Sequence, residues 1–578
     1  MRTVDSHRHS NDGCGRVGSL AGWRWPVAMI LVFAACGSRC SAVLAGVRSG
    51  PSLAGADSPR PRAPFRLLYS DDTTHITTCV SPYHKKGQPW RPEMLAAAVD
   101  EVAGTGVEVH MIQLAHGQVP WYQSTVYPIR EHRAWWKSHF GVDPLAGGAG
   151  GIHQYLLRGG DPLRVFLDRC HRAGQKAFVS LRLNDAHHVE HIGTGGNTKG
   201  FHAISRFYAE HLDCRIGPDV RDWNQRTLNW ARPVVRDYMF SLIREQCRRY
   251  PIDGYELDFM RHPSFFRLKE TTAAQRAGIM TDFVRRVRAV LDVTAGSGGR
   301  RWLCVRVPCH LRAHDALGID LPAMVAAGVD MVNLSFHYFT AQQADQAAIR
   351  KKVPGARVYL EMCHCTRVGP RIGPKGTYDS FSFRRTTPAQ YYTAAHLAYA
   401  RGLDGVSTFN FVYYREHGTG ERGPFHEPPF GVLKHLADRD WLARQPQHYI
   451  LSDVWGPPSI PGRPLPRKMK AGQSASFRFD MAPPAGGWKK GGRFRIQAAE
   501  NLGPSTWTAT LNGAKLAGTP DRREPYANPY SPLLATPGHH RAWTVPAEAL
   551  SDGVHTVVVT MTAGKTDAKL VFLDFALE

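Results

Sequence analysis

The chain has 578 residues, of which 43% are apolar and 10% aromatic, so it is too long for a single hydrophobic core and too apolar for a disordered or fibrous protein, and we expect two folded domains. Its formal net charge of +23 favours polyanionic partners through long-range attraction. The basic residues are dispersed along the chain without a basic tail or a recognisable nucleic-acid module, which argues against a nucleic-acid partner and leaves an acidic polysaccharide as the specific alternative.

The N-terminal segment predicts export. Residues 1–45 combine several arginines, a short apolar stretch and a small-residue cleavage site that ends at Ala45, as signal peptides do. A lipoprotein signal is the alternative, because Cys36 follows a poor version of the small-residue box. Arg39 interrupts the apolar stretch before the roughly 20 residues that a membrane span needs, so we expect no stable span. Residues 46–64 predict a flexible lead-in, and we expect a periplasmic or extracellular protein.

Residues 65–445 predict an α/β domain, because short β-branched runs alternate with helical patterns. The eight strand candidates are 65–70, 107–114, 176–183, 252–259, 302–307, 329–335, 357–362 and 405–411. Eight βα units with long loops predict a (β/α)8 barrel, the TIM-barrel fold, rather than an open doubly wound sheet. In this fold the active site lies at the C-terminal ends of the strands.

Residues 446–578 predict an all-β domain. Proline-rich sequence leads into runs in which apolar and polar residues alternate, and Asn512-Gly513 is a strong hairpin-turn signal. We expect a β-sandwich. Its aromatic residues form no compact cluster in the sequence, so we favour packing against the barrel over independent carbohydrate binding.

The cysteines of the mature chain are scattered. Three of the 11 cysteines fall in the signal, which leaves Cys79, Cys170, Cys214, Cys247, Cys304, Cys309, Cys363 and Cys365. One or two disulfides would suit an exported protein, whereas buried free thiols explain those in apolar strands, and no spacing resembles a zinc motif.

The fourth strand carries two acids in an apolar run. Side chains alternate along a strand, so Glu256 and Asp258 share the face that points into the barrel. A carboxylate there is costly unless it is paired or used in catalysis. The structural alternative is an ion pair with Arg261, just beyond the strand.

The seventh strand ends in a further acid, Glu361. Two carboxylates on separate strands of one barrel mouth are what glycoside hydrolysis requires, one to protonate the leaving oxygen and one to attack the anomeric carbon or activate water. The catalytic candidates are therefore Asp258, Glu361 and Glu256, and the sequence does not choose between retention and inversion. The structural alternative for Glu361 is that it clamps an arginine.

Polar side chains gather at the other strand ends as well, and we expect them to bind substrate. They are Asp72, His116, Arg182, Asn184, Asp185, His187, Arg261, His310, Arg312, His337, Tyr338 and Asn410. The basic members predict a positive cleft and hence sulfated or uronic sugars. A metal site of His187, His188 and His364 is an alternative, but neighbouring histidines point apart on an extended chain, so we expect no metal ion and no cofactor.

Three motifs support this interpretation: Asp-Gly-Tyr-Glu-Leu-Asp-Phe-Met-Arg at 253–261, Leu-Asn-Trp-Ala at 228–231, and Arg-Leu-Asn-Asp-Ala-His at 182–187. Together they resemble a family of exported bacterial glycosyl-hydrolase-like barrel proteins, over most of residues 65–445. The resemblance implies the barrel and the reaction class more firmly than the substrate. Similarity to the wider clan of barrel glycosidases implies that the strand-four carboxylate is the acid/base and Glu361 the nucleophile. That clan usually has Asn-Glu on strand four, so the choice between Glu256 and Asp258 stays open.

Three functions remain to be separated. The first is an exported glycoside hydrolase acting on a polysaccharide or oligosaccharide. The second is a non-catalytic glycan-binding protein on a degenerate barrel, which would be nearly indifferent to loss of the Glu361 carboxylate. The third is a metal-dependent deacetylase or lyase, which a chelator would inactivate.

Overall fold

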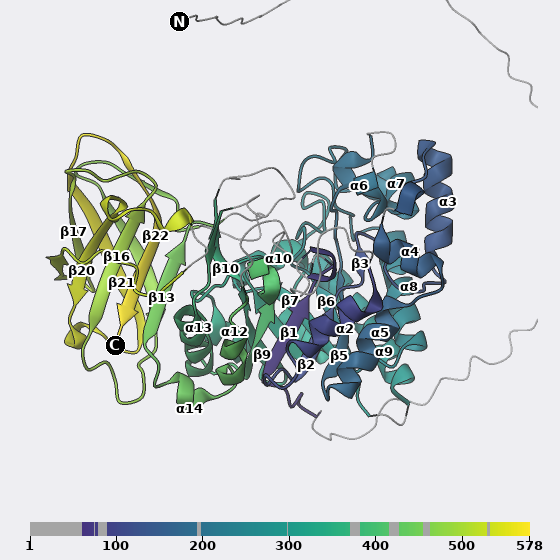
Figure 1. Ribbon diagram of the computed structural model, residues 1–578, viewed down its shortest axis with the longest axis horizontal. Helices are drawn as coiled ribbons and strands as arrows, with labels where there is room; N and C mark the ends of the chain where they lie inside the picture. Colours follow the sequence, from purple (N-terminus) through teal and green to yellow (C-terminus); the bar gives the residue numbers. More distant parts are fainter. Residues whose placement is uncertain are drawn as a thin grey trace, which may run out of the picture. The chain divides into compact units, whose positions relative to one another are not determined.

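The computed structural model describes residues 61–578 except 74, 79–89, 149, 194–197, 297–298, 370–381, 416–426, 455–462 and 529–531 (Figure 1). The expected export signal, most of the lead-in and Cys79 lie outside the described residues. Within the described part of the chain, no helix has the length and apolar character needed to cross a membrane.

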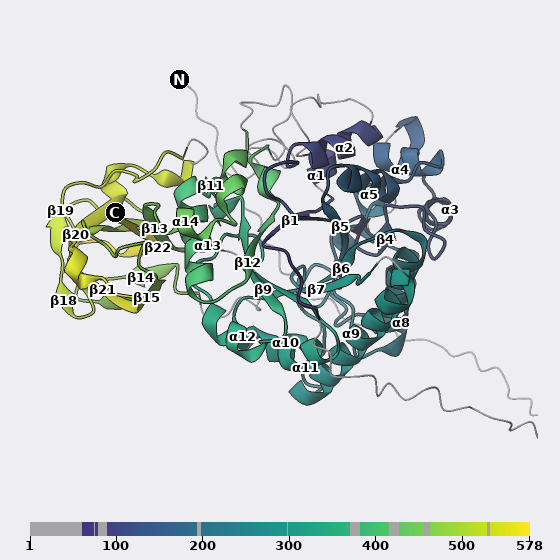
Figure 2. The ribbon, with the colours of Figure 1, turned by 90° about the horizontal axis from the view of Figure 1, so that it is seen from below.

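Eight parallel strands close into a barrel, as the sequence predicts, in the order β1-β12-β9-β8-β7-β6-β5-β2. They are β1 (Leu67–Asp71), β2 (Val109–Ile112), β5 (Lys176–Arg182), β6 (Gly254–Asp258), β7 (Trp302–Pro308), β8 (Met331–Ser335), β9 (Arg357–Cys363) and β12 (Gly405–Phe409). Each lies within one of the predicted runs or extends one residue beyond it. Figure 2 shows helices on the outside of this ring of strands.

The covering helices begin at the signals that helix capping predicts. The longer ones are α2 (Pro92–Asp100), α3 (Ile129–Phe140), α5 (Pro162–Arg172), α8 (Pro233–Arg249), α9 (Ala273–Ala295) and α13 (Pro388–Ala400), with α4 (Gly151–Leu157), α11 (Leu321–Ala326) and α12 (Gln346–Lys352) shorter. Proline at the first helical position of α8 loses no helical hydrogen bond. Thr272 and Thr387 form capping boxes that satisfy the first amide groups of α9 and α13.

Strand β6 shows how alternation separates core from site. Tyr255, Leu257 and Phe259 pack in the main apolar core, whereas Glu256 and Asp258 hydrogen-bond to side chains of neighbouring barrel strands. The predicted assignment of faces is confirmed. The upper part of the barrel interior is therefore polar, and a separate small apolar cluster that includes Phe65, Phe178 and Tyr359 fills the opposite end.

The loops at the C-terminal ends of the strands carry additional elements. A small hairpin, β3 (Ala115–His116) and β4 (Val119–Pro120), follows β2, and a second, β10 (Cys365–Val368) with β11 (Phe383–Arg385), follows β9. The helices α6 (Thr198–Phe201) and α7 (Arg206–Glu210) lie in the long connection after β5. Residues of both hairpins and of the connection after β5 line a cavity at the barrel mouth.

The C-terminal region is all-β, as expected, with two antiparallel sheets. One has the order β13-β22-β16-β20-β19 with β14 beside β22, and the other β15-β21-β17-β18. The strands are β13 (Gln447–Ser452), β14 (Arg467–Met469), β15 (Ser474–Met481), β16 (Gly492–Ala498), β17 (Thr506–Leu511), β18 (Ala514–Lys515), β19 (Ala517–Thr519), β20 (His540–Val545), β21 (Gly553–Ala563) and β22 (Ala568–Leu577). Asn512 and Gly513 both have positive φ and connect β17 to β18, the predicted hairpin turn.

The all-β region contacts the barrel through buried polar groups. The Gln342 side chain, in the loop after β8, donates to the carbonyl oxygens of Gln390 (3.2 Å) and His448 (2.9 Å) and accepts from the Ile450 N–H (2.8 Å). Arg384 of β11 pairs with Glu524 at 2.8 Å. A single glutamine thus satisfies backbone groups of both α13 and β13.

Seven cysteines fall within the described residues, and all seven are buried free thiols. Apolar surroundings, rather than pairing, account for their positions.

Candidate active site

A cavity of about 330 Å³ lies at the C-terminal ends of the barrel strands, and we call it the mouth pocket. Its size is at the lower end of the range typical of small-molecule sites. It is lined by Asp72, His116, Arg182, His187, His188, Glu190, Trp223, Arg226, Met260, Arg261, His262, Arg306, His337, Tyr338, Val368, Phe383, Phe409, Asn410 and Tyr413. The pocket therefore stands where the barrel fold predicts a site.

Arg306 of β7 organises the floor of the mouth pocket. Its Nε and Nη2 each lie 2.6 Å from an oxygen of Glu361, and its Nη1 lies 3.0 and 3.1 Å from the two oxygens of Asp258. Its guanidinium also lies over the Phe409 ring, 4.0 Å from the centroid. One buried cation thus joins the acids of the fourth and seventh barrel strands.

The two expected catalytic acids lie behind this arginine. Arg306 lines the mouth pocket, whereas Asp258 and Glu361 do not, so the expectation that both carboxyl groups face one cavity is not met. Because both contact one guanidinium, they lie well within the roughly 9.5 Å that inverting glycosidases allow between their carboxyl groups.

Glu361 and Asp258 differ in how fully they are bonded. Besides Arg306, Glu361 accepts from the Ser335 hydroxyl (2.7 Å) and the Asn333 amide (3.3 Å), so each of its oxygens has two donors. Asp258 accepts additionally from the Met260 N–H at 2.7 Å. Glu361 is the more firmly held of the two.

Glu256 lies deeper in the barrel than Asp258 and bonds to uncharged groups. It accepts from the Ser180 hydroxyl at 2.8 Å, with the Asn333 amide at 3.4 Å and the Cys304 thiol at 3.6 Å. Burial, followed by the charge of Asp258, raises the pKa of Glu256 to about 7. The nearby Arg306 is committed to the other two acids.

Asp72 follows strand β1 directly, and its side chain lines the mouth pocket. It pairs with Arg182 at 2.7 Å, and it accepts from the Asn410 amide at 3.3 Å and from the Tyr413 hydroxyl. Side chains from the ends of β1, β5 and β12 thereby meet at one carboxylate. All four of these residues are buried.

His187 stands between an acid and an arginine. Its Nδ1 hydrogen-bonds to Asp185, and its Nε2 accepts from the Arg261 Nε at 2.8 Å. The structural alternative, an ion pair of Arg261 with a strand-four acid, is not found among the described residues, where Asp258 pairs with Arg182 and Arg306 instead. The chain turns sharply after Met260, with His262 at a φ of 51°, which directs Arg261 toward the loop after β5.

Eight of the twelve expected binding residues line the mouth pocket: Asp72, His116, Arg182, His187, Arg261, His337, Tyr338 and Asn410. Asp185 lies just behind His187. Asn184 serves a structural role instead, since its amide group bonds to both the N–H and the C=O of Leu228 and to the Ser264 C=O.

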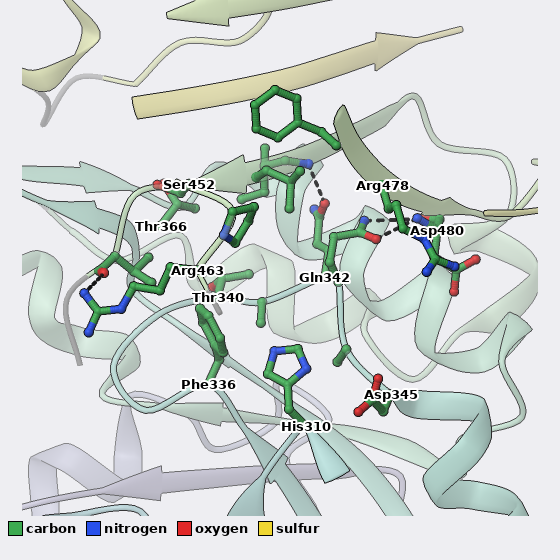
Figure 3. A pocket seen from close by; sticks show the side chains of 18 of the residues that line it. His310, Phe336, Thr340, Gln342, Asp345, Thr366, Ser452, Arg463, Arg478 and Asp480 are labelled. Atoms are coloured by element: carbon green, nitrogen blue, oxygen red, sulfur yellow. Dashed lines mark hydrogen bonds between the residues drawn. The ribbon is translucent and has the colours of Figure 1, made fainter. Parts of the chain in front are cut away.

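His310 and Arg312 were expected in the same cleft and lie elsewhere. They line a separate cavity of about 770 Å³, shared with Phe477 and Arg478 of the all-β region (Figure 3). The cause is local: Asp345 accepts from the Leu311 N–H at 2.9 Å and holds this segment against the loop 340–345. The chain beyond β7 therefore leads away from the barrel axis.

The other lining residues are not among the expected binding residues, and they are Glu190, His188, Trp223, Arg226, Met260, His262, Arg306, Val368, Phe383, Phe409 and Tyr413. Arg306 carried a usable signal, because a lone arginine at an inward position of an apolar barrel strand needs acidic partners. Trp223 and Arg226 carried none, since they belong to a long connection whose course the sequence does not define.

The cations that line the pocket are arginines, and three of the four are paired with acids: Arg182 with Asp72, Arg226 with Glu190, and Arg306 with Asp258 and Glu361. Burial lowers the pKa of His116 to about 3 and holds the pKa values of His187, His262 and His337 well below the usual range. These histidines are neutral near pH 7. The prediction of a positive cleft therefore depends on Arg261, for which no ion pair is found among the described residues, rather than on histidine.

The histidine group considered from the sequence, His187 with His188 and His364, is not formed. His364 is buried against Tyr338 and Phe383, with ring centroids 4.9 and 5.1 Å apart, and its Nδ1 lies 3.2 Å from the Cys363 sulfur. It points into the wall made by β9 and the β10–β11 hairpin.

No family model matches the chain. The 1,4-alpha-glucan branching enzymes GlgB 2 of Xanthomonas campestris pv. campestris (strain 8004) and Xanthomonas oryzae pv. oryzae (strain KACC10331 / KXO85) are each 30% identical to it, over 159 and 157 residues. Each match covers 25% of this chain and 19% of the relative. The chain therefore spans about a fifth of the length of the curated relatives it matches.

The solved structures that match part of the chain include three glycosidases. A GH138 enzyme targeting pectin rhamnogalacturonan II has a TM-score of 0.38 and 11% identity, over 65% of this chain and 39% of its own. Alpha-L-fucosidase isoenzyme 1 from Paenibacillus thiaminolyticus has a TM-score of 0.33 and 14% identity, over 87% of this chain and 96% of its own. The alpha-amylase from Geobacillus thermoleovorans has a TM-score of 0.36 and 10% identity, over 86% of this chain and 98% of its own.

Proposed function

We propose that the protein is an exported glycoside hydrolase that cleaves a polysaccharide or oligosaccharide at the mouth pocket. The observation that carries the proposal is the unit Asp258–Arg306–Glu361, in which one arginine gathers carboxylates from the fourth and seventh barrel strands at the floor of a ligand-sized cavity. Carboxylates so close together meet the first geometric requirement of glycosidic cleavage.

Asp258 is the better candidate for the strand-four role. Glu256 is buried beneath it and bonded to uncharged groups, whereas Asp258 bonds directly to the arginine that lines the pocket. Glu361 would act as its partner once a substrate oxygen takes over part of the Arg306 hydrogen bonding. Hydrogen bonds in ligand-free sites commonly rearrange when substrate binds.

The arginines around the pocket favour an anionic sugar. Arg182, Arg226 and Arg261 all line the cavity. Arg182 and Arg226 are paired with Asp72 and Glu190, whereas Arg261 bonds to the neutral ring of His187. A guanidinium can hold a sulfate or a uronic carboxylate through two parallel hydrogen bonds. The class of substrate proposed is therefore a sulfated or uronic glycan.

A glycan-binding protein without catalysis is the second candidate. The saturation of Glu361 by four hydrogen bonds, and its position behind Arg306, favour it. In that case the three acids and Arg306 would serve only as a charge-balanced barrel core.

Turnover and affinity measured separately decide between the two. The purified protein is screened on matched pairs of charged and desulfated or neutral glycans, with Asp258→Asn and Glu361→Gln as test variants and Glu93→Gln, at an exposed position, as the control. We expect both test variants to lose at least about 100-fold in kcat while retaining affinity. A protein that binds a glycan but turns over none on the panel, with binding unchanged in Glu361→Gln, contradicts the hydrolase and supports the second candidate.

A further inference from the structure

Histidines crowd one side of the mouth pocket, outside the Asp258–Arg306–Glu361 unit. The ring centroid of His116 lies 4.9 Å from that of His187 and 5.3 Å from that of His188. The ring centroids of His187 and His262 are also 4.9 Å apart. A group of neutral imidazoles beside a carboxylate is the kind of donor set that zinc and its neighbours prefer. The proposed hydrolysis uses none of these side chains.

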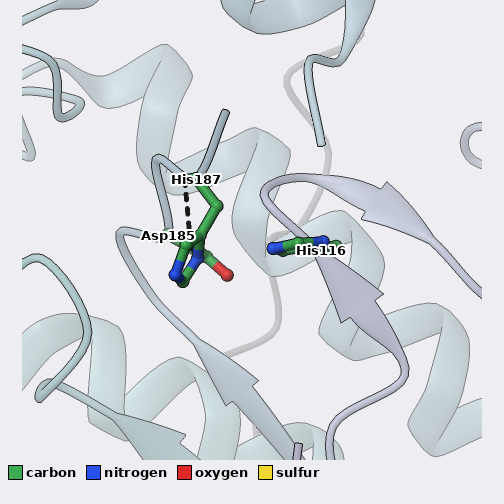
Figure 4. Close-up of side chains that lie close together, drawn as sticks. All are labelled: His116, Asp185 and His187. Atoms are coloured by element: carbon green, nitrogen blue, oxygen red, sulfur yellow. Dashed lines mark hydrogen bonds and ion pairs between the residues drawn. The ribbon is translucent and has the colours of Figure 1, made fainter. Parts of the chain in front are cut away.

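His116 is available as a ligand. It ends strand β3, is only half-buried and lines the mouth pocket, and among the described residues no hydrogen bond to either of its ring nitrogens is formed. The β3–β4 hairpin that carries it is fixed from two directions, since Gln118 donates to the Asp185 C=O at 2.9 Å and the Trp121 N–H to the Leu114 C=O at 2.8 Å. Figure 4 shows His116 facing the Asp185–His187 pair across a gap.

The Asp185–His187 pair has the form that metal sites use. A metal-binding histidine commonly gives one ring N–H to a carboxylate, which fixes the tautomer and turns the other nitrogen outward as an acceptor. Here Nδ1 of His187 faces Asp185, and Nε2 already accepts from a cation, the guanidinium of Arg261. Asp185 is held as a charged carboxylate by His187 and by Arg182 at 3.5 Å.

We propose that His116 and His187 bind a divalent transition-metal ion of the zinc class at the wall of the mouth pocket, with Asp185 as the carboxylate that holds Nδ1 of His187. Donor atoms of His116 and His187 lie within 4.8 Å of each other, and a tetrahedral site with bonds of about 2.1 Å needs donors about 3.4 Å apart. Small side-chain rotations therefore close the site, and Arg261 leaves Nε2 to the ion. The position beside Arg182 and Arg261 would let the ion bind an anionic substrate group as a further ligand.

A neighbouring group must be distinguished from this site. His188, Glu190 and His191 also bring donor atoms within 4.8 Å of one another, but none of the three is buried, whereas Asp185 of the first group is. Glu190 is also paired with Arg226 at 3.1 Å. We assign the ion to the first group because two of its members are tied to buried structure, the His116 hairpin and Asp185.

Metal binding to the untagged full chain tests the proposal without any glycan. Protein stripped with a chelator is titrated with Zn²⁺ by calorimetry and with Co²⁺ by visible absorption, and the metal content is measured by mass spectrometry. We expect about one ion per chain, with affinity lowered at least about 10-fold in His116→Ala and in His187→Ala. His310→Ala, which removes a half-buried histidine of the other cavity, should leave the affinity unchanged.

Three results would overturn the assignment. They are no saturable binding of either ion, an equal loss of metal affinity in His310→Ala, or a loss of metal affinity in His191→Ala with none in His116→Ala. Circular dichroism of each variant establishes that it is folded. If His116→Ala does not fold, His187→Ala provides the test. Because binding is read without substrate, failure here leaves the proposed hydrolase untouched.

Discussion

At the scale of single residues, the stability of the charged barrel interior depends on Arg306. It balances Asp258 and Glu361 while being almost fully buried itself. Removing one partner of a buried ion pair leaves charge uncompensated and costs about 3–5 kcal/mol. We expect Arg306→Met to lower the free energy of unfolding by at least that amount in urea denaturation.

The matched control for Arg306 is Arg172→Met, at an exposed helix end, for which we expect a change within about 0.5 kcal/mol. Similar stability in the two variants would show that the buried acids are neutral in the folded protein and need no arginine.

Glu256 makes stability depend on pH. Its folded pKa is raised to about 7 from a usual 4.5, so between these values the unfolded state releases a proton that the folded state keeps. Stability therefore falls as pH rises through this window, by up to about 3 kcal/mol, and Glu256→Gln should remove the loss. Urea denaturation at about pH 4.5 and about pH 8 measures it. The assignment is contradicted if the free energy of unfolding of Glu256→Gln changes between the two pH values as much as that of the exposed-site control Glu93→Gln.

At the scale of elements, the β3–β4 hairpin depends on one glycine. Gly117 has a φ of +55°, and a Cβ there would collide with the Ala203 carbonyl group. Gly141 has a φ of +72° with open space around it, so it isolates the backbone cost of about 1 kcal/mol. We expect Gly117→Ala to destabilise the protein by at least about 2 kcal/mol, more than Gly141→Ala, in thermal or urea unfolding. Equal effects would mean that the hairpin moves freely away from Ala203.

At the scale of the whole molecule, Gln342 couples the barrel to the all-β region. Gln342→Ala leaves the Ile450 N–H and the Gln390 and His448 carbonyl oxygens without these partners, which should cost about 2–3 kcal/mol. Gln473→Ala, which breaks one exposed local bond to Lys470, is the control. Calorimetry should show one unfolding transition in the wild type and a lowered Tm in Gln342→Ala. An unchanged Tm would indicate that the contact contributes nothing to stability.

Much of the barrel could be predicted because its signals are local. Each strand is a short β-branched run bounded by helix signals, so all eight were found, and alternation alone assigned Tyr255, Leu257 and Phe259 to the core and Glu256 and Asp258 to the interior. Barrel polarity then placed the polar strand ends at one mouth. For that reason eight of the twelve expected binding residues line a single pocket.

The sequence by itself thus determined the strands, their faces and the end of the barrel where polar groups collect, since these follow from periods of two and 3.6 residues. Only the tertiary structure decided which charges meet: that Arg306, rather than Arg261, joins the two acids, that His310 and Arg312 turn to another cavity, and that His116 meets Asp185 and His187. The physical reason is that such pairings depend on the course of long loops and on competition among buried partners that lie tens of residues apart in the chain, which no local pattern records.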